Sequence, residues 1–283
     1  MHVETSPEVA GEEVASSIPL VSVVLPCYKQ SEQALDSTRR IQETLERTIG
    51  RNWEIVVVDD GGGGFEAIAP EDSRVKILIS GKNRGKGAAL RKGLLKARGH
   101  SRIFTDADLP FAPLLIPVMH GYLQEGEFHL VAGDRTLRES VYHESTSTVR
   151  RLLSSAATFM IGTLVTGGVF DTQCGLKGIR GDIADLLLPL TRINRFAFDV
   201  ELMYLALRFN CNVLRIPVEM RESSTSSTVR PLADSVGAAR DILRIKQRAM
   251  SGQYESAALR QIIGAPFRRR VADTEDAIGR SDG

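Results

Sequence analysis

The chain has 283 residues, of which 42% are hydrophobic and 25% charged, as expected for a folded globular protein rather than a disordered one. Its formal net charge is only +1, so it lacks the broad positive field that holds a nucleic acid backbone, and we expect no nucleic acid partner. The three cysteines lack the spacing of a zinc site or disulfide framework, which fits a reducing compartment. The length allows one large α/β domain.

The two ends of the chain differ from its middle. Residues 1–18 lack the basic start and apolar run of a signal peptide, so we predict a flexible tail and no export. After about Ser251 the pattern fades, and we predict a partly disordered tail over residues 251–283. Residues 19–250 are predicted to form a single domain. The uncharged stretch from Leu152 to Phe170 is diluted by glycines, and we predict that it does not span a membrane.

Strand and helix patterns alternate along residues 19–250. Short β-branched runs predict strands, and apolar residues at helical spacing predict helices. In chain order we predict strands and helices as follows: strand Val21 to Pro26, helix Glu32 to Ile49, strands Glu54 to Val58 and Val75 to Ile79, helix Gly85 to Arg98, strands Arg102 to Thr105 and Leu130 to Ala132, and helix Val200 to Phe209. The alternation predicts a mainly parallel sheet with helices on both faces, whose ligands bind at the carboxyl ends of the strands.

Asp106 and Asp108 directly follow a predicted strand. Two carboxylates one residue apart at such a position can bind one Mg²⁺ or Mn²⁺, with water and phosphate oxygens completing the shell. The competing interpretation is that they cap a turn before a helix near Pro113, because Asp is a favoured capping residue. The tripeptide alone leaves both interpretations open.

Two further polar segments also follow predicted strands. Asp59 and Asp60 precede four glycines, so the carboxylates could accept hydrogen bonds from a base or a ribose while the backbone approaches closely. An ordinary flexible turn is the alternative. The segment from Asn83 to Ala89 begins a helix and carries two cations, which suits a diphosphate group.

Six sequence blocks in one order carry a family resemblance. They are VVLPCY from Val23, VVDDG from Val57, NRGKG from Asn83, DADLP from Asp106, DTQCGLK from Asp171 and RFAFDVE from Arg195. Together they closely resemble the family-two inverting glycosyltransferases of the Rossmann-like GT-A fold. The last two blocks resemble the branch that makes polyprenyl-phosphate sugars, the dolichyl-phosphate glucosyl- and mannosyltransferases. The resemblance covers about Val21 to Lys246.

The resemblance implies a reaction and a set of site residues. A hexose would move from a nucleotide diphosphate sugar, of the UDP-glucose or GDP-mannose type, to a polyprenyl phosphate with the help of Mg²⁺ or Mn²⁺. The implied residues are Pro26, Tyr28, Asp59, Asp60, Lys86 and Asp106 for the donor, Asp106 and Asp108 for the metal, Arg135, Arg150, Ser154 and Lys177 for the acceptor, and Asp171, then Asp199, for catalysis. Gln30 and Gly62 depart from the family's usual acid and serine, which could alter donor selection.

Other interpretations stay open at this point. Asp171 could cap a turn, Lys177 could be a solvated charge, and Asp199 could be the N-cap of the helix from Val200. A soluble enzyme of the same family could instead glycosylate a hydroxyl of a small metabolite, because the transmembrane segments of many relatives are not found in this sequence. A nucleotidyltransferase would carry a glycine-rich basic segment where Pro26-Cys27-Tyr28 stands, and a noncatalytic binding module would not need the paired acids.

The nature of the acceptor decides whether a base is needed. A phosphate monoester is already anionic, so Arg135 and Arg150 would matter more than a base, whereas a hydroxyl acceptor would require Asp171 to take a proton.

The segment from Ala238 to Met250 is predicted to be an amphipathic helix. Ala238, Ile242, Ile245 and Ala249 share one face, while Arg240, Arg244 and Arg248 share another. We favour packing of the apolar face on the protein with the arginines in water. The alternative is that the arginines and the stretch Leu152 to Phe170 rest on an anionic membrane surface. From the cysteine pattern and the lack of a signal-peptide pattern we expect a cytoplasmic protein. Peripheral contact at the cytoplasmic membrane face is a further hypothesis.

Overall fold

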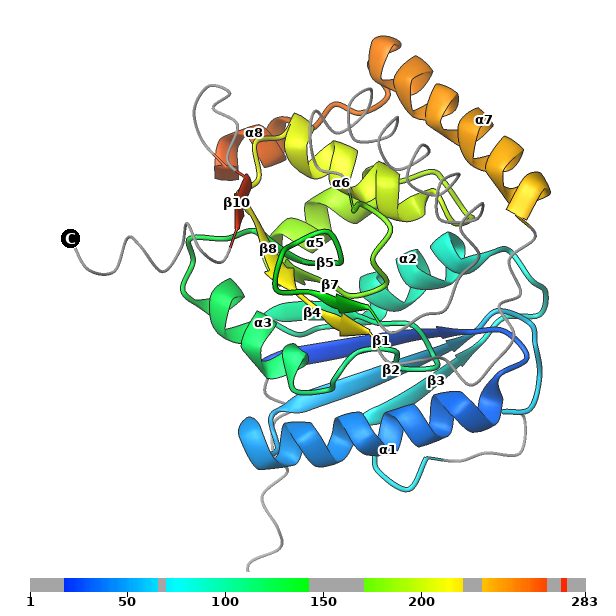
Figure 1. The fold of residues 1–283 in the computed structure, drawn as a ribbon, viewed down its shortest axis with the longest axis vertical. Helices are drawn as coiled ribbons and strands as arrows, with labels where there is room; N and C mark the ends of the chain where they lie inside the picture. The colour runs from blue at the N-terminus through cyan, green and yellow to red at the C-terminus, as the bar shows by residue number, and fades with distance from the viewer. Residues whose placement is uncertain (1–17, 66–69, 143–170, 221–230, 264–270, 274–283) are drawn as a thin grey trace, which may run out of the picture.

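The computed structural model describes residues 18–65, 70–142, 171–220, 231–263 and 271–273. Arg150, Ser154 and the stretch Leu152 to Phe170 lie outside these residues. The described chain forms one α/β domain around a mostly parallel sheet with helices on both faces (Figure 1). None of its described helices is long and apolar enough to cross a membrane.

The elements alternate as the sequence predicts. The strands are β1 (Val21–Cys27), β2 (Trp53–Asp59), β3 (Val75–Ile79), β4 (Ser101–Phe104), β5 (Leu130–Asp134), β6 (Val141–Tyr142), β7 (Lys177–Arg180), β8 (Val213–Pro217), β9 (Glu219–Met220) and β10 (Val271–Asp273). The helices are α1 (Ser31–Thr48), α2 (Lys86–Lys96), α3 (Leu115–Gln124), α5 (Gly181–Leu187), α6 (Phe198–Arg208), α7 (Pro231–Met250) and α8 (Ala257–Ile263), with a 3-10 turn η1 (Leu188–Leu190). The eight predicted elements are confirmed to within about two residues at their ends, which is the usual scatter of helix and strand boundaries.

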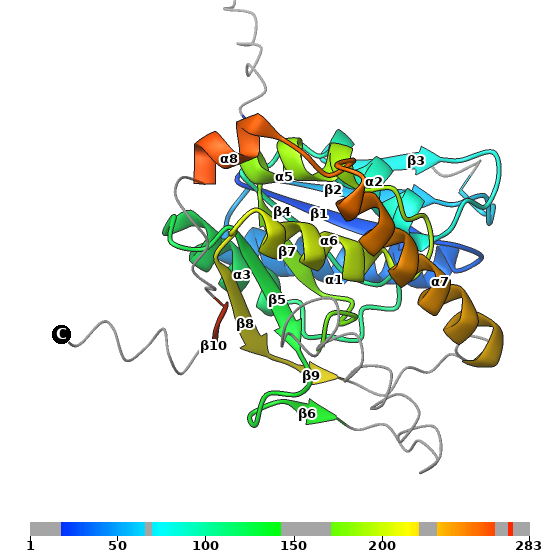
Figure 2. The same ribbon diagram turned by 90° about the horizontal axis from the view of Figure 1, so that it is seen from above.

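The strand order of the main sheet is β10-β8-β5-β7-β4-β1-β2-β3. Every pair in this sheet is parallel except those of β7, which runs antiparallel to both β4 and β5. The amino-terminal end of β7 therefore lies at the same edge as the carboxyl ends of its neighbours. Figure 2 shows the short β6–β9 pair beyond the ends of β5 and β8.

Apolar residues on both faces of the strands explain why helices cover the sheet on two sides. On one face, Val24, Val58 and Phe104 join a buried cluster with residues of α2, α5 and α6. On the other face, alternating residues such as Val23 and Val57 join a second cluster with residues of α1 and α3. Because strands buried on both faces read as continuous apolar runs, β1 and β2 are the clearest strand signals in the sequence.

The packed core extends beyond Ser251, where the sequence predicts a partly disordered tail. Tyr254 and Leu259 are fully buried in the cluster formed with α5 and α6. The Tyr254 hydroxyl donates a hydrogen bond to the buried carboxylate of Glu201 on α6. This long-range contact anchors a short segment whose local pattern is too brief to predict a helix.

Candidate active site

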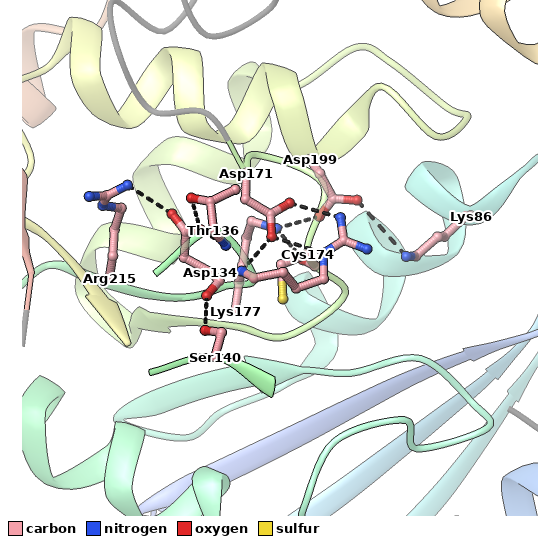
Figure 3. A network of polar contacts seen from close by, with 10 residues as sticks. Lys86, Asp134, Thr136, Ser140, Asp171, Cys174, Lys177, Asp199 and Arg215 are labelled. Atoms are coloured by element: carbon pink, nitrogen blue, oxygen red, sulfur yellow. Dashed lines mark hydrogen bonds and ion pairs between the residues drawn. The ribbon is translucent and has the colours of Figure 1, made fainter. Parts of the chain in front are cut away.

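The polar motifs meet at one edge of the sheet. Asp59 ends β2, Asp106 follows β4, Arg135 follows β5, and Lys177 begins the antiparallel strand β7. Figure 3 shows Asp199 paired with both Lys177 and Lys86, and Asp171 beside them. The edge thus gathers motifs that are far apart in the sequence, as expected for a ligand site of a parallel α/β sheet.

Asp59 and Asp60 bind backbone amides of their own chain. The Asp59 carboxylate accepts hydrogen bonds from the amides of Gly62 and Gly63 at 2.7 and 3.2 Å. The Asp60 carboxylate accepts bonds from the amides of Arg84 and Gly85 at 2.9 and 2.6 Å, which ties the end of β2 to the start of α2. Two adjacent buried carboxylates are tolerated because these amides satisfy them. Their contact with a donor stays a prediction.

The loop after β1 lies against this turn. Tyr28 is exposed at the end of β1 and Pro26 is half-buried. A Cβ at Gly62 would overlap the backbone of Lys29, so the loop fills the space that the family's serine would occupy. Glycine at position 62 therefore allows the loop that carries Tyr28 to take this path.

Asp106 and Asp108 lie in a turn that is tied to α1. The Ser37 hydroxyl of α1 donates to the carbonyl of Ala107 at 2.7 Å, and both aspartates are half-buried. Neither aspartate is the N-cap of α3, because Leu114 holds that position with no side-chain capping bond. The two carboxylates remain suited to a hard cation.

Gly175 provides the surface against which Asp106 rests. A Cβ at Gly175 would overlap the Asp106 carboxylate, so only glycine permits this approach. No group of three or more His, Cys, Asp or Glu side chains suited to a metal occurs among the described residues. The donor set therefore fits an ion that shares its shell with a bound diphosphate and water, rather than one held by the protein alone.

Lys86 lies between Asp106, which follows β4, and Asp199 on α6. Its ammonium Nζ lies 2.6 Å from Asp106 Oδ1 and 3.9 Å from Asp199 Oδ2. Burial by itself would lower the pKa of Lys86, but the charges of Asp106 and Asp199 outweigh it and hold that pKa above its ordinary value. Lys86 is therefore a cation at neutral pH.

Lys177 lies beneath the site with 0% of its surface exposed. Its ammonium donates to the Cys174 carbonyl and pairs with Asp199 Oδ1 at 3.2 Å. The solvated-charge alternative for Lys177 is thus wrong, and its predicted acceptor contact could only be indirect in this arrangement. Asp199 is not an N-cap either, because Ala197 caps α6 and Asp199 lies within its first turn.

Asp171 is paired with Arg135. The Arg135 backbone amide and Nε donate to Asp171 Oδ2 at 2.7 and 2.9 Å, and Nη2 donates to Oδ1 at 2.8 Å. Burial would raise the pKa of Asp171, but these bonds and the Arg135 charge outweigh it and hold that pKa below its usual range. The Asp171 side chain is 5% exposed, whereas that of Arg135 is 33% exposed. The group that solvent can reach is therefore the guanidinium of Arg135, held in place by Asp171, and not the Asp171 carboxylate.

Neighbouring bonds fix the backbone on either side of Arg135. Asp134 accepts from the amide and hydroxyl of Thr136 at 2.7 and 2.6 Å and pairs with Arg215 at 2.9 Å (Figure 3). The Cys174 thiol is buried, and burial raises its pKa to about 12, so it is a packed residue rather than a nucleophile.

The role of Glu201 is not apparent from the local sequence. This fully buried carboxylate accepts from the amides of Arg192 and Ile193, both at 2.7 Å, and thereby holds the loop before α6. The carbonyl of Asn194 in that loop accepts from the amide of Ala88 in α2 at 3.1 Å. Glu201 belongs to the RFAFDVE block, but nothing local identifies its partners.

Comparison with known proteins identifies the family. The model of glycosyl transferase family 2 matches residues 22–187. The chain belongs to this family. A dolichyl-phosphate beta-glucosyltransferase of Dictyostelium discoideum is 29% identical over 83% of this chain and 76% of the relative. The enzyme of that name from Homo sapiens is 28% identical over 86% of this chain and 79% of the relative. The predicted resemblance is confirmed, and the chain is a nucleotide-sugar-dependent glycosyltransferase.

Solved structures give the same fold. Glucosyl-3-phosphoglycerate synthase of Mycobacterium tuberculosis, in complex with phosphoglyceric acid, matches with a TM-score of 0.58 and 18% identity over 90% of this chain and 84% of that one. Mannosyl-3-phosphoglycerate synthase of Rubrobacter xylanophilus matches with a TM-score of 0.58 and 19% identity over 85% of this chain and 77% of that one. The predicted GT-A fold is confirmed.

Proposed function

We propose that this glycosyltransferase moves a hexose, with inversion, from a nucleotide diphosphate sugar to a polyprenyl phosphate. The observation that carries the proposal is the Arg135–Asp171 pair. Both oxygens of Asp171 accept hydrogen bonds from Arg135, and the low pKa of this carboxyl makes it a weak base. A phosphate acceptor needs no base, since it is already anionic at neutral pH. The relatives named dolichyl-phosphate beta-glucosyltransferase point to the same acceptor class.

In this proposal Asp171 positions Arg135, and Arg135 binds the acceptor phosphate. A guanidinium clamped at its backbone amide, Nε and Nη2 has lost much of its rotational freedom. Its binding of an anion therefore costs less conformational entropy than binding by a free arginine. Arg150 and Ser154 are proposed as further phosphate contacts, and Asp199 as a second-choice catalytic carboxylate.

For the donor we propose contacts from Pro26, Tyr28, Asp59, Asp60, Lys86 and Asp106. Asp106 and Asp108 would hold Mg²⁺ or Mn²⁺. The ion would offset negative charge on the departing diphosphate. Lys86, at the start of α2, would add a positive charge beside the same diphosphate. A structure of the mycobacterial glucosyl-3-phosphoglycerate synthase contains Mn²⁺ and UDP-glucose, and this likeness in fold makes both reasonable first probes.

Peripheral contact with a membrane would bring the site to a lipid-linked acceptor. The outer side of α7 carries Arg240, Leu243, Arg244 and Met250 at exposed positions. Basic residues interleaved with apolar ones suit an anionic lipid surface. We propose this as the route to a polyprenyl phosphate.

Acceptor chemistry tests the proposal directly. The protein is incubated with Mn²⁺ or Mg²⁺ and either UDP-glucose or GDP-mannose, and nucleotide release is followed with a polyprenyl phosphate or with the matching free polyprenol. We expect release with the phosphate only, and loss of release in EDTA. Equal activity with the polyprenol would contradict the role assigned to Arg135. Activity with 3-phosphoglycerate or a hydroxylated metabolite, and none with the lipid, would favour the small-acceptor alternative.

Replacement of Arg135 separates acceptor binding from donor chemistry. We expect Arg135→Ala to lower kcat/KM for the phosphate acceptor by an amount equivalent to about 1.5–3 kcal/mol, the scale of a charge-assisted hydrogen bond. Hydrolysis of the donor without acceptor should change little. Arg138→Ala, which removes an exposed arginine three residues away, is the matched control and should keep both activities.

A further inference from the structure

Lys86 stands between two carboxylates at unequal distances. Its Nζ makes a close ion pair with Asp106 Oδ1 at 2.6 Å and a longer one with Asp199 Oδ2 at 3.9 Å. The ammonium thus already faces a second anionic partner.

Asp106 cannot serve Lys86 and a divalent ion equally well. Its carboxylate rests on Gly175, where no side chain would fit, and its Oδ1 is already paired with the Lys86 ammonium. A divalent ion bound to this carboxylate would lie a few ångströms from the Lys86 ammonium, and the two positive charges would repel each other. In the structure described here, Lys86 therefore competes with a metal for Asp106.

Asp199 offers Lys86 a second position. Its Oδ1 is held at 3.2 Å by Lys177, a fully buried cation that has no room to leave. Its Oδ2 faces Lys86, and a movement of about 1 Å would bring that ammonium to normal hydrogen-bonding distance. A lysine side chain reaches both positions by rotating its flexible stem. Asp199 therefore has one fixed cation and room for one exchangeable cation.

We propose that Lys86 is an exchangeable counter-ion that binds Asp106 before the donor arrives and moves to Asp199 when metal and diphosphate bind. This inference rests on the metal site of the proposed function. It assigns Asp199 a role in charge balance. It also implies that free metal binds weakly, whereas metal and nucleotide bind together, because the diphosphate supplies the negative charge that accommodates both cations.

Direct measurement of Mn²⁺ binding tests the exchange without any catalytic readout. Free Mn²⁺ is followed by electron paramagnetic resonance in titrations of wild type, Lys86→Met and Lys92→Met, each with and without UDP, and with GDP in a parallel series. We expect Lys86→Met to bind Mn²⁺ without nucleotide at least about tenfold more tightly than wild type. The enhancement of Mn²⁺ binding by nucleotide should shrink in the same variant.

The control variants separate the exchange from a general charge effect. Lys92 lies on the same helix, but its Nζ donates to Ile79 and Ser80 rather than to a site carboxylate, so Lys92→Met should bind Mn²⁺ like wild type. Lys86→Arg keeps the charge and should keep the weak binding of free metal. Asp199→Asn removes the second position and should weaken binding of Mn²⁺ with UDP at least about tenfold.

Three outcomes would overturn the proposed exchange of Lys86 between Asp106 and Asp199. Metal binding that is equal or weaker in Lys86→Met than in wild type overturns the exchange, provided that the variant has the wild-type circular dichroism. If that variant does not fold, unchanged Mn²⁺–UDP affinity in Asp199→Asn overturns it instead. Absence of Mn²⁺ binding in all proteins, with or without nucleotide, overturns both the exchange and the metal dependence of the proposed function.

Discussion

At the residue scale, the candidate site depends on contacts between motifs rather than on any motif alone. The carboxylate of Asp60 joins β2 to α2, and Gly175 supports Asp106 from a segment 69 positions further along the chain. These four motifs thus lie in contact in pairs. Substitutions that disturb such a contact should affect ligand binding more than stability.

Gly175→Ala tests the support of Asp106. The added methyl group would displace the carboxylate from the position proposed for metal binding, so we expect Mn²⁺–nucleotide affinity and transfer activity to fall at least about tenfold. The melting temperature should change little, because the short Asp106 side chain can give way. Gly121→Ala is the control: nothing lies within 4 Å of its added Cβ, so activity should persist and stability rise by about 0.5–1 kcal/mol. Equal effects of the two variants would contradict the supporting role.

Glu54 gives a pH-dependent prediction at a distance from the site. This buried carboxylate accepts bonds from Lys76 Nζ, the Arg98 amide and the Ser22 hydroxyl at 2.7, 2.6 and 2.7 Å. Burial would raise the pKa of Glu54, but these bonds outweigh it and hold the pKa below the ordinary value of 4.5. The stabilisation is therefore complete above pH 4.5 and is lost as the pH falls through the lower folded-state pKa.

We expect Glu54→Gln to lower the free energy of unfolding by about 1.5–3 kcal/mol at pH 7, with a smaller difference from wild type below pH 4. Urea unfolding across this pH range measures it. Glu46→Gln, which removes a partly exposed partner of Arg74, should cost no more than about 1 kcal/mol. A difference that stays constant down to pH 3 would refute the assignment.

At the element scale, α7 packs against α6 through one face of its helix. Ile245 is fully buried in the core cluster, and Ile242 and Ala249 pack beside it, which confirms the predicted packing of the apolar stripe for the described side chains. The side chain of Ala238 lies outside the described ones. The prediction of three arginines in water is wrong for Arg248, which is half-buried and pairs with Glu201 at 3.7 Å. A buried carboxylate on α6 draws it inward.

Two substitutions on α7 test this orientation. Ile245→Ala should lower the free energy of unfolding by about 2–4 kcal/mol, because it removes buried carbon atoms and leaves a cavity. Leu243→Ala, two residues earlier and 68% exposed, should change stability by less than about 0.5 kcal/mol. Chemical denaturation compares them. Similar losses for both would mean that α7 is not packed as described.

At the scale of the whole molecule, α7 lies at the periphery, outside α6 (Figures 1 and 2). Its Arg240 and Arg244 are exposed, and Leu243 and Met250 lie among the exposed large apolar residues. Surface binding depends on such local groups rather than on the near-zero net charge. We expect this side of the molecule to face an anionic membrane.

Cosedimentation with liposomes checks this expectation. Binding should increase with anionic lipid, weaken in high salt, and fall in the double variant Arg240→Gln/Arg244→Gln. Arg248→Gln should instead reduce stability through Glu201, with no specific loss of lipid binding in the folded protein. If wild type stays in the supernatant with anionic liposomes at low salt, the membrane contact is excluded and a small soluble acceptor is favoured.

The sequence by itself determined the alternation of strands and helices, the edge of the sheet that carries the site, and the family. These follow from local patterns: apolar runs in β1 and β2, helical spacing in α1, and motifs placed directly after strands. Only the tertiary structure decided that Asp171 is bound by Arg135, that Lys177 is buried, and that the core continues to Tyr254 and Leu259. Asp171 and its partner Arg135 are 36 positions apart in the sequence, and Tyr254 and its partner Glu201 are 53 apart. The spacing of apolar residues in the sequence indicates whether a segment forms a helix or a strand. The charge state and burial of a side chain depend instead on which distant residues the folded chain brings beside it.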